Sequence, residues 1–201
     1  MTKIPLTRRQ ASAEHAEAIR NAVRTAETMP CRAHVATQAN TDALTALLID
    51  PQISDPIYSL PKPITRNAVS AFIDRHQQER ARGEGLLMIV DDGEKAAAGY
   101  YDIQFWPEWA ACELGGAIRP DRQGAHTGMD GAASAFDWLF DEIGVDLICE
   151  TAARNNVRTA KLLEHIGFRY LGEIESETPG GGVRPSHYWE MTRADRAAAR
   201  K

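Results

Sequence analysis

The chain has 201 residues, of which 43% are apolar and 25% are charged, and its formal net charge is −5. These proportions are typical of a folded globular protein and exclude a collagen-like or disordered chain. The negative charge argues against a nucleic-acid-binding protein, because such proteins usually carry a basic surface. The longest aliphatic run, residues 86–90, is too short to span a membrane, and residues 1–30 lack the apolar segment of a secretory signal. We therefore expect a cytoplasmic protein, with Cys31, Cys112 and Cys149 reduced and buried in its core.

The first predicted element is a helix over residues 10–28, which carries a narrow, alanine-rich apolar stripe. Such a stripe buries little area, so the helix must pack on the rest of the chain or on a second copy, and the second arrangement predicts a homodimer. A short strand over residues 32–37, a helix over 40–50 and a proline-rich loop over 51–64 follow. The next helix begins at 65 and ends at 83, with Val69, Phe72, Ile73 and His76 on its apolar face.

Three strands come next without helices between them, over residues 86–90, 97–106 and 110–118, which predicts an antiparallel meander. A strongly amphipathic helix over residues 129–143 follows and stops at Gly144. The pattern then predicts a buried strand, a helix, two further strands and a solvated helical tail, over residues 146–152, 156–166, 168–174, 187–192 and 193–201. This order of elements is typical of a single α+β domain.

The chain lacks the motifs of nucleophile-elbow hydrolases, P-loop proteins, dinucleotide-binding folds and zinc proteases. Its six histidines are too widely spaced in the sequence for a local cluster, so we expect no bound metal.

Residues 119–128 lie between the last strand of the meander and the amphipathic helix. A helix N-terminus presents free backbone N–H groups and the positive end of the helix dipole, which together suit a phosphate or pyrophosphate. Arg119 and Arg122 add positive charge, and Gly124 and Gly128 allow an anion to approach the backbone closely. The alternative is an ordinary surface loop with glycine at a turn.

Two segments resemble the signature motifs of the GNAT acetyltransferase superfamily. Gln123-Gly124-Ala125-His126-Thr127-Gly128 is similar to its acyl-CoA pyrophosphate loop, and residues 156–168 are similar to its second motif, in which an asparagine opens a helix that ends in Gly-Phe. Asp50-Pro51, Leu60-Pro61 and the closing strand at 187–191 resemble the ribosomal-protein N-acetyltransferase (RimJ/RimL-like) branch.

The resemblance implies the acyl-CoA N-acyltransferase fold, an α+β domain with a central mixed, mostly antiparallel twisted sheet flanked by helices. That domain would span residues 30–192, with an N-terminal helical extension over 1–29 and a C-terminal tail over 193–201. The resemblance also implies acetyl-CoA as co-substrate, transferred directly to a primary amine of a protein, a peptide or a small molecule without an acyl-enzyme. The residues that it implies for holding acetyl-CoA are those of segment 123–128 together with Ile118, Asn156 and Thr159.

His126 departs from the family pattern, because it stands where the family has its first loop glycine and its side chain crowds the approach of a phosphate. Three interpretations stay open: the imidazole helps to hold the phosphate, binding is weakened or shifted, or the domain no longer uses acetyl-CoA. The last would make the chain a GNAT-like binding or regulatory domain without turnover. An unrelated α+β binding domain is a further hypothesis. Leu163 is a milder departure, since it replaces the tyrosine acid of many members.

Acetyl transfer to an amine requires a base, stabilisation of the developing oxyanion and departure of a thiolate. The resemblance implies that the pantetheine arm pairs with strand 110–118, where Gly115-Gly116 allows a bulge or a close approach. Alternation places Glu113 opposite its neighbours, where it is the first candidate base, and the alternative is a solvent-facing glutamate. Glu150, on strand 146–152, is the second candidate.

Two pairs of residues complete the predicted site. Asn156 is a natural helix cap as well as a CoA contact, and Thr159 contacts either the departing thiolate or the backbone of the first helical turn. Trp106 and Trp109 flank a turn and are expected to line the acceptor site.

Overall fold

The computed structural model describes residues 4–57, 59–93, 96–122, 127–177 and 182–200, with the backbone alone at 127–130 and 177. The helices are α1 (Ala13–Thr25), α2 (Thr41–Leu48), α3 (Pro51–Ser54), α4 (Arg66–Arg82), α5 (Thr127–Trp138), α6 (Val157–Ile166) and α7 (Arg193–Ala199). The strands are β1 (Thr28–Met29), β2 (Ala33–Val35), β3 (Gly85–Asp91), β4 (Ala97–Trp106), β5 (Ala111–Ile118), β6 (Leu147–Ala153), β7 (Arg169–Glu177) and β8 (Val183–Thr192). Short helical turns are η1 (Gln38–Asn40), η2 (Pro107–Trp109), η3 (Pro120–Arg122) and the π-helical turn η4 (Leu139–Ile143).

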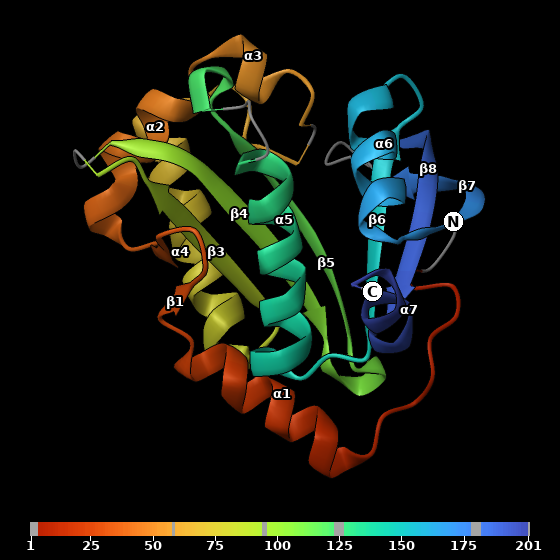
Figure 1. Ribbon diagram of the computed structural model, residues 1–201. Coiled ribbons are helices and arrows are strands. Elements are labelled where there is room, and N and C mark those ends of the chain that lie inside the picture. The colour runs from red at the N-terminus through yellow and green to blue at the C-terminus, as the bar shows by residue number, and fades with distance from the viewer. Residues whose placement is uncertain (1–3, 58, 94–95, 123–126, 178–181, 201) are drawn as a thin grey trace.

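The strands form one eight-stranded sheet in the order β1-β2-β3-β4-β5-β6-β8-β7. Neighbouring strands are antiparallel except for β5 and β6, which run parallel. A parallel pair needs a crossover connection, and α5 supplies it. Figure 1 shows α5 and α6 in front of the sheet and α4 behind it. The mixed, mostly antiparallel sheet flanked by helices confirms the predicted fold class.

Both faces of β3 and β4 are covered, because the side chains of a strand alternate between two cores. Leu86 and Met88 lie in the core beneath α5, which contributes Phe136. The intervening Leu87 lies in a second core on the other face, together with Phe72 of α4. None of the helices among the described residues is long and apolar enough to cross a lipid bilayer.

The apolar stripe of α1 packs against the chain's own core, next to η2, α4 and η4. Ile19 and Val23 are fully buried in the core beneath α5. The N-terminal segment is also tied to the β4–β5 turn, since the Ala11 N–H donates to the Glu108 carbonyl over 2.8 Å. The stripe that raised the question of a second copy is therefore already covered within one chain.

Two predicted features are corrected at the start of the chain. The loop predicted over 51–64 contains the short helix α3, because the Asp50 side chain accepts a hydrogen bond from the Gln52 N–H over 2.9 Å and Pro51 occupies the first helical position. Cys31 is exposed rather than buried, and its φ of 65° places it in a left-handed turn. Cys112 and Cys149 are buried, as expected.

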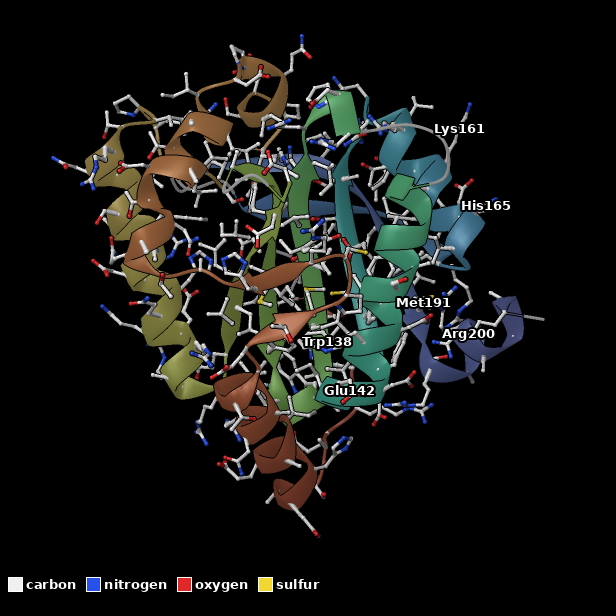
Figure 2. All side chains as sticks on the ribbon, turned by 60° about the vertical axis from the view of Figure 1, so that its left-hand side comes forward. Trp138, Glu142, Lys161, His165, Met191 and Arg200 are labelled. Atoms are coloured by element: carbon white, nitrogen blue, oxygen red, sulfur yellow. The ribbon has the colours of Figure 1, made fainter. Side chains whose placement is uncertain are left out.

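The C-terminal tail is helical and largely exposed, as predicted, and two of its arginines tie it to α5. Arg196 forms two hydrogen bonds with Asp137 of α5, over 2.5 Å and 3.0 Å, and Arg200 pairs with the same carboxylate. Figure 2 shows Arg200 at the side of α7 that faces α5. Asp137 carries both contacts, and the hydrogen bonds from these arginines outweigh its burial and lower its pKa.

Candidate functional site

The parallel strands β5 and β6 separate after a short paired region. Their register runs from Ala111 opposite Leu147 to Glu113 opposite Cys149, although β5 continues to Ile118 and β6 to Ala153. Figure 1 shows the two strands diverging toward the end of the sheet at which α5 and α6 begin. We call the point after Glu113 the strand split. It combines unpaired strand backbone with two helix N-termini, the arrangement that the resemblance implies for acyl-CoA.

Glu150 occupies the first position beyond the paired region. Its Oε1 accepts a hydrogen bond from the Leu114 N–H over 3.1 Å, so a side chain replaces the missing backbone partner of β5. Only 6% of Glu150 is exposed. Burial, and then the neighbouring charge of Glu113, raise its pKa well above the ordinary glutamate value, although the Leu114 N–H opposes them.

Glu113 lies on the other face of the sheet. Cys112 and Leu114 pack in the core beneath α5, so alternation directs Glu113 toward the face of α4. Its Oε1 accepts a hydrogen bond from the Thr151 hydroxyl over 2.7 Å. Burial raises the pKa of Glu113 and the charge of Asp102 adds to this, while Thr151 and Arg184 oppose them. Glu113 is thus a partly buried, hydrogen-bonded carboxylate at the split and not an ordinary solvent-facing residue.

Gly115 and Gly116 follow Glu113 on β5 without a bulge, because their register with Asp102 and Tyr101 is regular. Gly116 has a φ of 145°, and a Cβ there would lie 2.2 Å from the Tyr100 carbonyl oxygen. This position therefore requires glycine. Of the two predicted roles, the structure has the close approach and not the bulge.

The predicted phosphate loop is described only in part. Gln123, Gly124, Ala125 and His126 lie outside the described residues, and Thr127 and Gly128 form the start of α5. Before the loop, Ile118 ends β5 and packs against the core beneath α5. The Arg119 guanidinium is bonded to Asp121 over 2.9 Å and 2.7 Å, so part of the predicted positive charge is neutralised locally.

The start of α6 forms as the sequence predicts. The Asn156 side chain accepts a hydrogen bond from the Thr159 N–H over 3.1 Å, which caps the helix. Thr159 is partly buried, and Leu163 is buried in the core beneath α5.

The two tryptophans have different surroundings. Trp106 lies on the same face as Glu113, opposite Ala111 in the register, and packs against a small apolar cluster that includes Tyr188. Trp109 lies in the turn after β4, and the Arg8 guanidinium covers its ring at 4.8 Å from the centroid. Of the two, the structure brings only Trp106 near Glu113.

A segment of the N-terminal extension lies across the same face, which the sequence did not predict. The N–H groups of Leu6 and Thr7 donate to Glu190 of β8 over 2.7 Å and 3.0 Å. The Tyr188 hydroxyl donates to the same carboxylate over 2.5 Å, and Glu190 is fully buried. Tyr188 stands opposite Thr151 in the register, so this segment reaches within two side chains of Glu113.

A separate hollow of about 490 Å³ lies between α1, β1 and the C-terminal end of α5. Figure 2 shows Trp138 and Glu142, which line it, near the strand that follows α1. Because it lies at the end of α5 away from the split, we assign it no part in the chemistry there. Among the described residues, no group of three or more histidine, cysteine or acidic side chains is arranged to hold a metal ion.

Comparison with known proteins agrees with this arrangement. The profile of the Acetyltransferase (GNAT) domain matches residues 32–169. No curated protein matches the chain by sequence. Ribosomal-protein-S5-alanine acetyltransferase from Vibrio fischeri superposes with a TM-score of 0.68 at 13% identity, over 81% of this chain and 93% of that one.

Two other similar structures contain ligands. RimJ from Mycobacterium smegmatis, in complex with CoA-disulfide, has a TM-score of 0.67 at 17% identity, over 81% of this chain and 82% of that one. The microcin C7 self-immunity acetyltransferase MccE, in complex with acetyl-CoA and AMP, has a TM-score of 0.68 at 12% identity, over 80% of this chain and 91% of that one. These likenesses concern the fold, and the profile match extends over most of the chain, which therefore belongs to the GNAT acetyltransferase family.

Proposed function

We propose that the protein is an acetyl-CoA-dependent N-acetyltransferase that transfers the acetyl group directly to a primary amine. Acetyl transfer follows from the family, and the amine acceptor is the further step. The observation that carries it is Glu113, a carboxylate at the strand split that is bonded to Thr151 and has a raised pKa. A base of this kind suits an acceptor that is protonated in water and must lose a proton before it attacks.

The residues around the split fit acyl-CoA. Beyond Leu114, whose N–H is held by Glu150, the described part of β5 has no partner strand on the β6 side, so its backbone is available to an extended arm. The N-terminus of α5 and the capped N-terminus of α6 lie at the same end of the sheet, where they would hold phosphate groups. We assign this role to residues 123–128, Ile118, Asn156 and Thr159. Acetyl-CoA would supply an activated thioester, with the acetyl carbon as the electrophile.

Glu113 acts as the general base in this proposal. Its carboxylate takes one proton from the acceptor ammonium, and the neutral nitrogen then forms the new C–N bond as the C–S bond breaks. The second proton that the nitrogen loses when the amide forms goes to the departing thiolate, so that CoA leaves as its thiol. The raised pKa suits this task, because a base works best when its pKa lies near the working pH. Thr159, in the first turn of α6, is the residue we assign to the departing thiolate.

We assign Glu150 a positioning role rather than that of the base. It lies on the face of α5 and α6, and its carboxyl holds the Leu114 N–H where β5 leaves β6. Burial raises the pKa of Glu150 well above the ordinary glutamate value, and its Oε1 is already bonded to the Leu114 N–H, so it is less free than Glu113 to take a proton from an acceptor. Glu150 therefore orders the backbone of β5 at the strand split.

For the acceptor, we favour the α-amine of a protein or peptide over a small-molecule amine. The support comes from the Vibrio fischeri protein of similar fold, which is a ribosomal-protein-S5-alanine acetyltransferase. Of the two tryptophans predicted to line the acceptor site, Trp106 lies on the same face of the sheet as Glu113. The cytoplasmic location and the homodimer stay predictions.

Calorimetric titration with acetyl-CoA, followed by assay of CoA release, tests the proposal. The acceptor panel contains peptides with free N-terminal alanine or serine, the same peptides with a blocked N-terminus, and small primary amines. We expect binding and release that depends on a free amine. Binding without release for any amine would support the alternative of a CoA-binding domain without turnover. If neither the wild type nor His126→Gly binds acetyl-CoA, the proposal is wrong.

A further inference from the structure

His76 of α4 is a buried histidine whose two ring nitrogens both face hydrogen-bond acceptors. Nδ1 lies 2.8 Å from the Phe72 carbonyl oxygen, and Nε2 lies 3.0 Å from Oδ1 of Asp102 on β4. Only 4% of His76 is exposed. A carbonyl and an ionised carboxylate accept but do not donate, so both contacts are made only by the doubly protonated imidazolium.

The electrostatic surroundings favour this charged form. Burial opposes the charge of His76, but the hydrogen bond and charge of Asp102, the Phe72 carbonyl and the charge of Glu79 together raise its pKa. Glu79 lies 3.7 Å from Nε2 and is itself paired with Arg75 at the surface, over 3.6 Å. His76 therefore fixes Asp102 in one orientation through a charge-assisted hydrogen bond.

Asp102 and Glu113 lie on the same face of neighbouring strands. Asp102 is opposite Gly115 in the register, and Glu113 is two residues before Gly115, so the two carboxylates are diagonal neighbours. The Asp102 side chain is 24% exposed, and its Oδ2 accepts no hydrogen bond from any described residue. Oδ1 of Asp102 is thus held by His76, while Oδ2 is available to a ligand.

The space between the two carboxylates is open on that face. A Cβ added to Gly115 would meet only the Asp102 carbonyl oxygen within 4 Å, at 3.6 Å. Gly115 is exposed, unlike the strand residues around it that pack under α4. The other charged group facing Glu113 is Arg184 of β8, which lowers its pKa without outweighing burial.

We propose that Asp102, held by His76, is a substrate-binding residue that binds the acceptor as its ammonium ion over Gly115, beside Glu113. This inference rests on the proposed function and deepens it, because it states the form in which the acceptor arrives. The ammonium donates to Asp102, and Glu113 removes the one proton whose loss frees the nitrogen for attack. A neutral analogue of the same shape, such as an alcohol, lacks the charge that Asp102 recognises.

The test measures binding apart from turnover. The wild type, Asp102→Asn and Asp102→Glu are titrated with 2-phenylethylamine and with 2-phenylethanol in the presence of CoA, and binding is followed by calorimetry or NMR. Asp42→Asn, which removes an exposed carboxylate paired with Arg66 on the α2–α4 side, is the matched control. We expect Asp102→Asn to weaken amine binding roughly ten- to a hundredfold, the range of one hydrogen bond to a charged group. Asp102→Glu should recover part of that loss, and the affinity for CoA should be unchanged.

The ¹⁵N resonances of His76 test separately whether His76 and Asp102 form the charged pair, whereas the difference between amine and alcohol affinity is the readout that a merely structural role would not move. At pH 7 we expect both ring nitrogens to be protonated in the wild type and one of them to be neutral in Asp102→Asn. Equal amine affinity in the wild type and Asp102→Asn, equal affinity for amine and alcohol, no amine binding to the wild type, or a neutral His76 in the wild type would each overturn the inference. Amine binding that depends on Asp102 without any CoA release would instead contradict the proposed function alone.

Discussion

Replacement of Glu113 by glutamine is the most direct test of the assigned base. The amide oxygen of glutamine can still accept the hydrogen bond that Thr151 donates to Glu113 over 2.7 Å. The variant therefore keeps the local packing of the strand split and removes only the ability to take a proton. Any loss of rate then reports on proton transfer rather than on a distorted sheet.

The size of the loss follows from general base catalysis. A positioned base contributes roughly 10²- to 10⁴-fold to the rate, which corresponds to about 3–5 kcal/mol in activation free energy. We expect kcat/KM for the amine to fall by that factor near pH 7. The KM for acetyl-CoA should stay within about twofold, because Glu113 takes no part in binding acetyl-CoA.

The direction in which the rate changes with pH follows from the raised pKa of Glu113. The raised pKa of Glu113 means that its ionised fraction falls as pH decreases through the range just above the ordinary glutamate value, so the wild-type rate should fall there. In Glu113→Gln that inflection should disappear, and the rate should rise with pH in parallel with the free-amine fraction of the acceptor.

The same shift predicts the effect on stability. Because the folded state holds the proton more tightly than the unfolded chain, the free energy of unfolding falls as pH rises from the ordinary glutamate value through the raised value. Glu113→Gln should remove this fall and unfold at the same or higher urea concentration at pH 8. A variant that keeps the wild-type rate at pH 6 and at pH 8 would show that Glu113 is not the base.

Three further substitutions test the scaffold of the site. Gly116→Ala should lower the free energy of unfolding by roughly 1–3 kcal/mol, because the residue has a positive φ and the added Cβ would lie 2.2 Å from the Tyr100 carbonyl oxygen. Gly115→Ala is the control, since its Cβ would meet its nearest neighbour at 3.6 Å, and urea denaturation should show a far smaller change for it. Glu190→Gln should cost roughly 1–3 kcal/mol, because an amide NH₂ replaces a buried acceptor, and faster hydrogen exchange confined to the N-terminal segment would identify the cause. Asn156→Ala removes the cap of α6 and should cost about 1 kcal/mol, and an unchanged urea midpoint would contradict the capping role.

The order of the elements was predictable because local signals specify it. Gly83, Gly144 and Gly167 end helices at φ values of 75°, 88° and 110°, the left-handed stops that the sequence indicates. The ends of strands were less predictable, because pairing with a neighbouring strand determines where a strand begins and ends. β8 begins at Val183 rather than at 187, since the residues before 187 pair with β7 although Pro185 makes the segment unlike a strand.

Residues of the candidate site could be predicted only where a local pattern in the sequence identifies them. Glu113, Asn156 and Thr159 could be named because alternation and helix capping are local rules. His76 and Asp102 could not be paired, because they belong to α4 and β4 and meet only when the helix packs on the sheet. The one local signal was a histidine within an otherwise apolar helical stripe, and such a side chain needs a polar partner when it is buried.

The two glutamates at the split illustrate why residue type and proximity alone do not assign chemistry. Each is close enough to raise the pKa of a neighbour, yet the pleat sends them to opposite faces of one sheet. Glu150 is bonded to the Leu114 backbone N–H, whereas Glu113 is bonded to the Thr151 hydroxyl and faces open space over Gly115. The charge of Glu113 adds to burial in raising the pKa of Glu150, and the faces and hydrogen-bond partners of the two carboxyls suit one structural group and one base. Exchange of the two roles would require β5 and β6 to slip by one residue, which would also turn Cys112 out of the core.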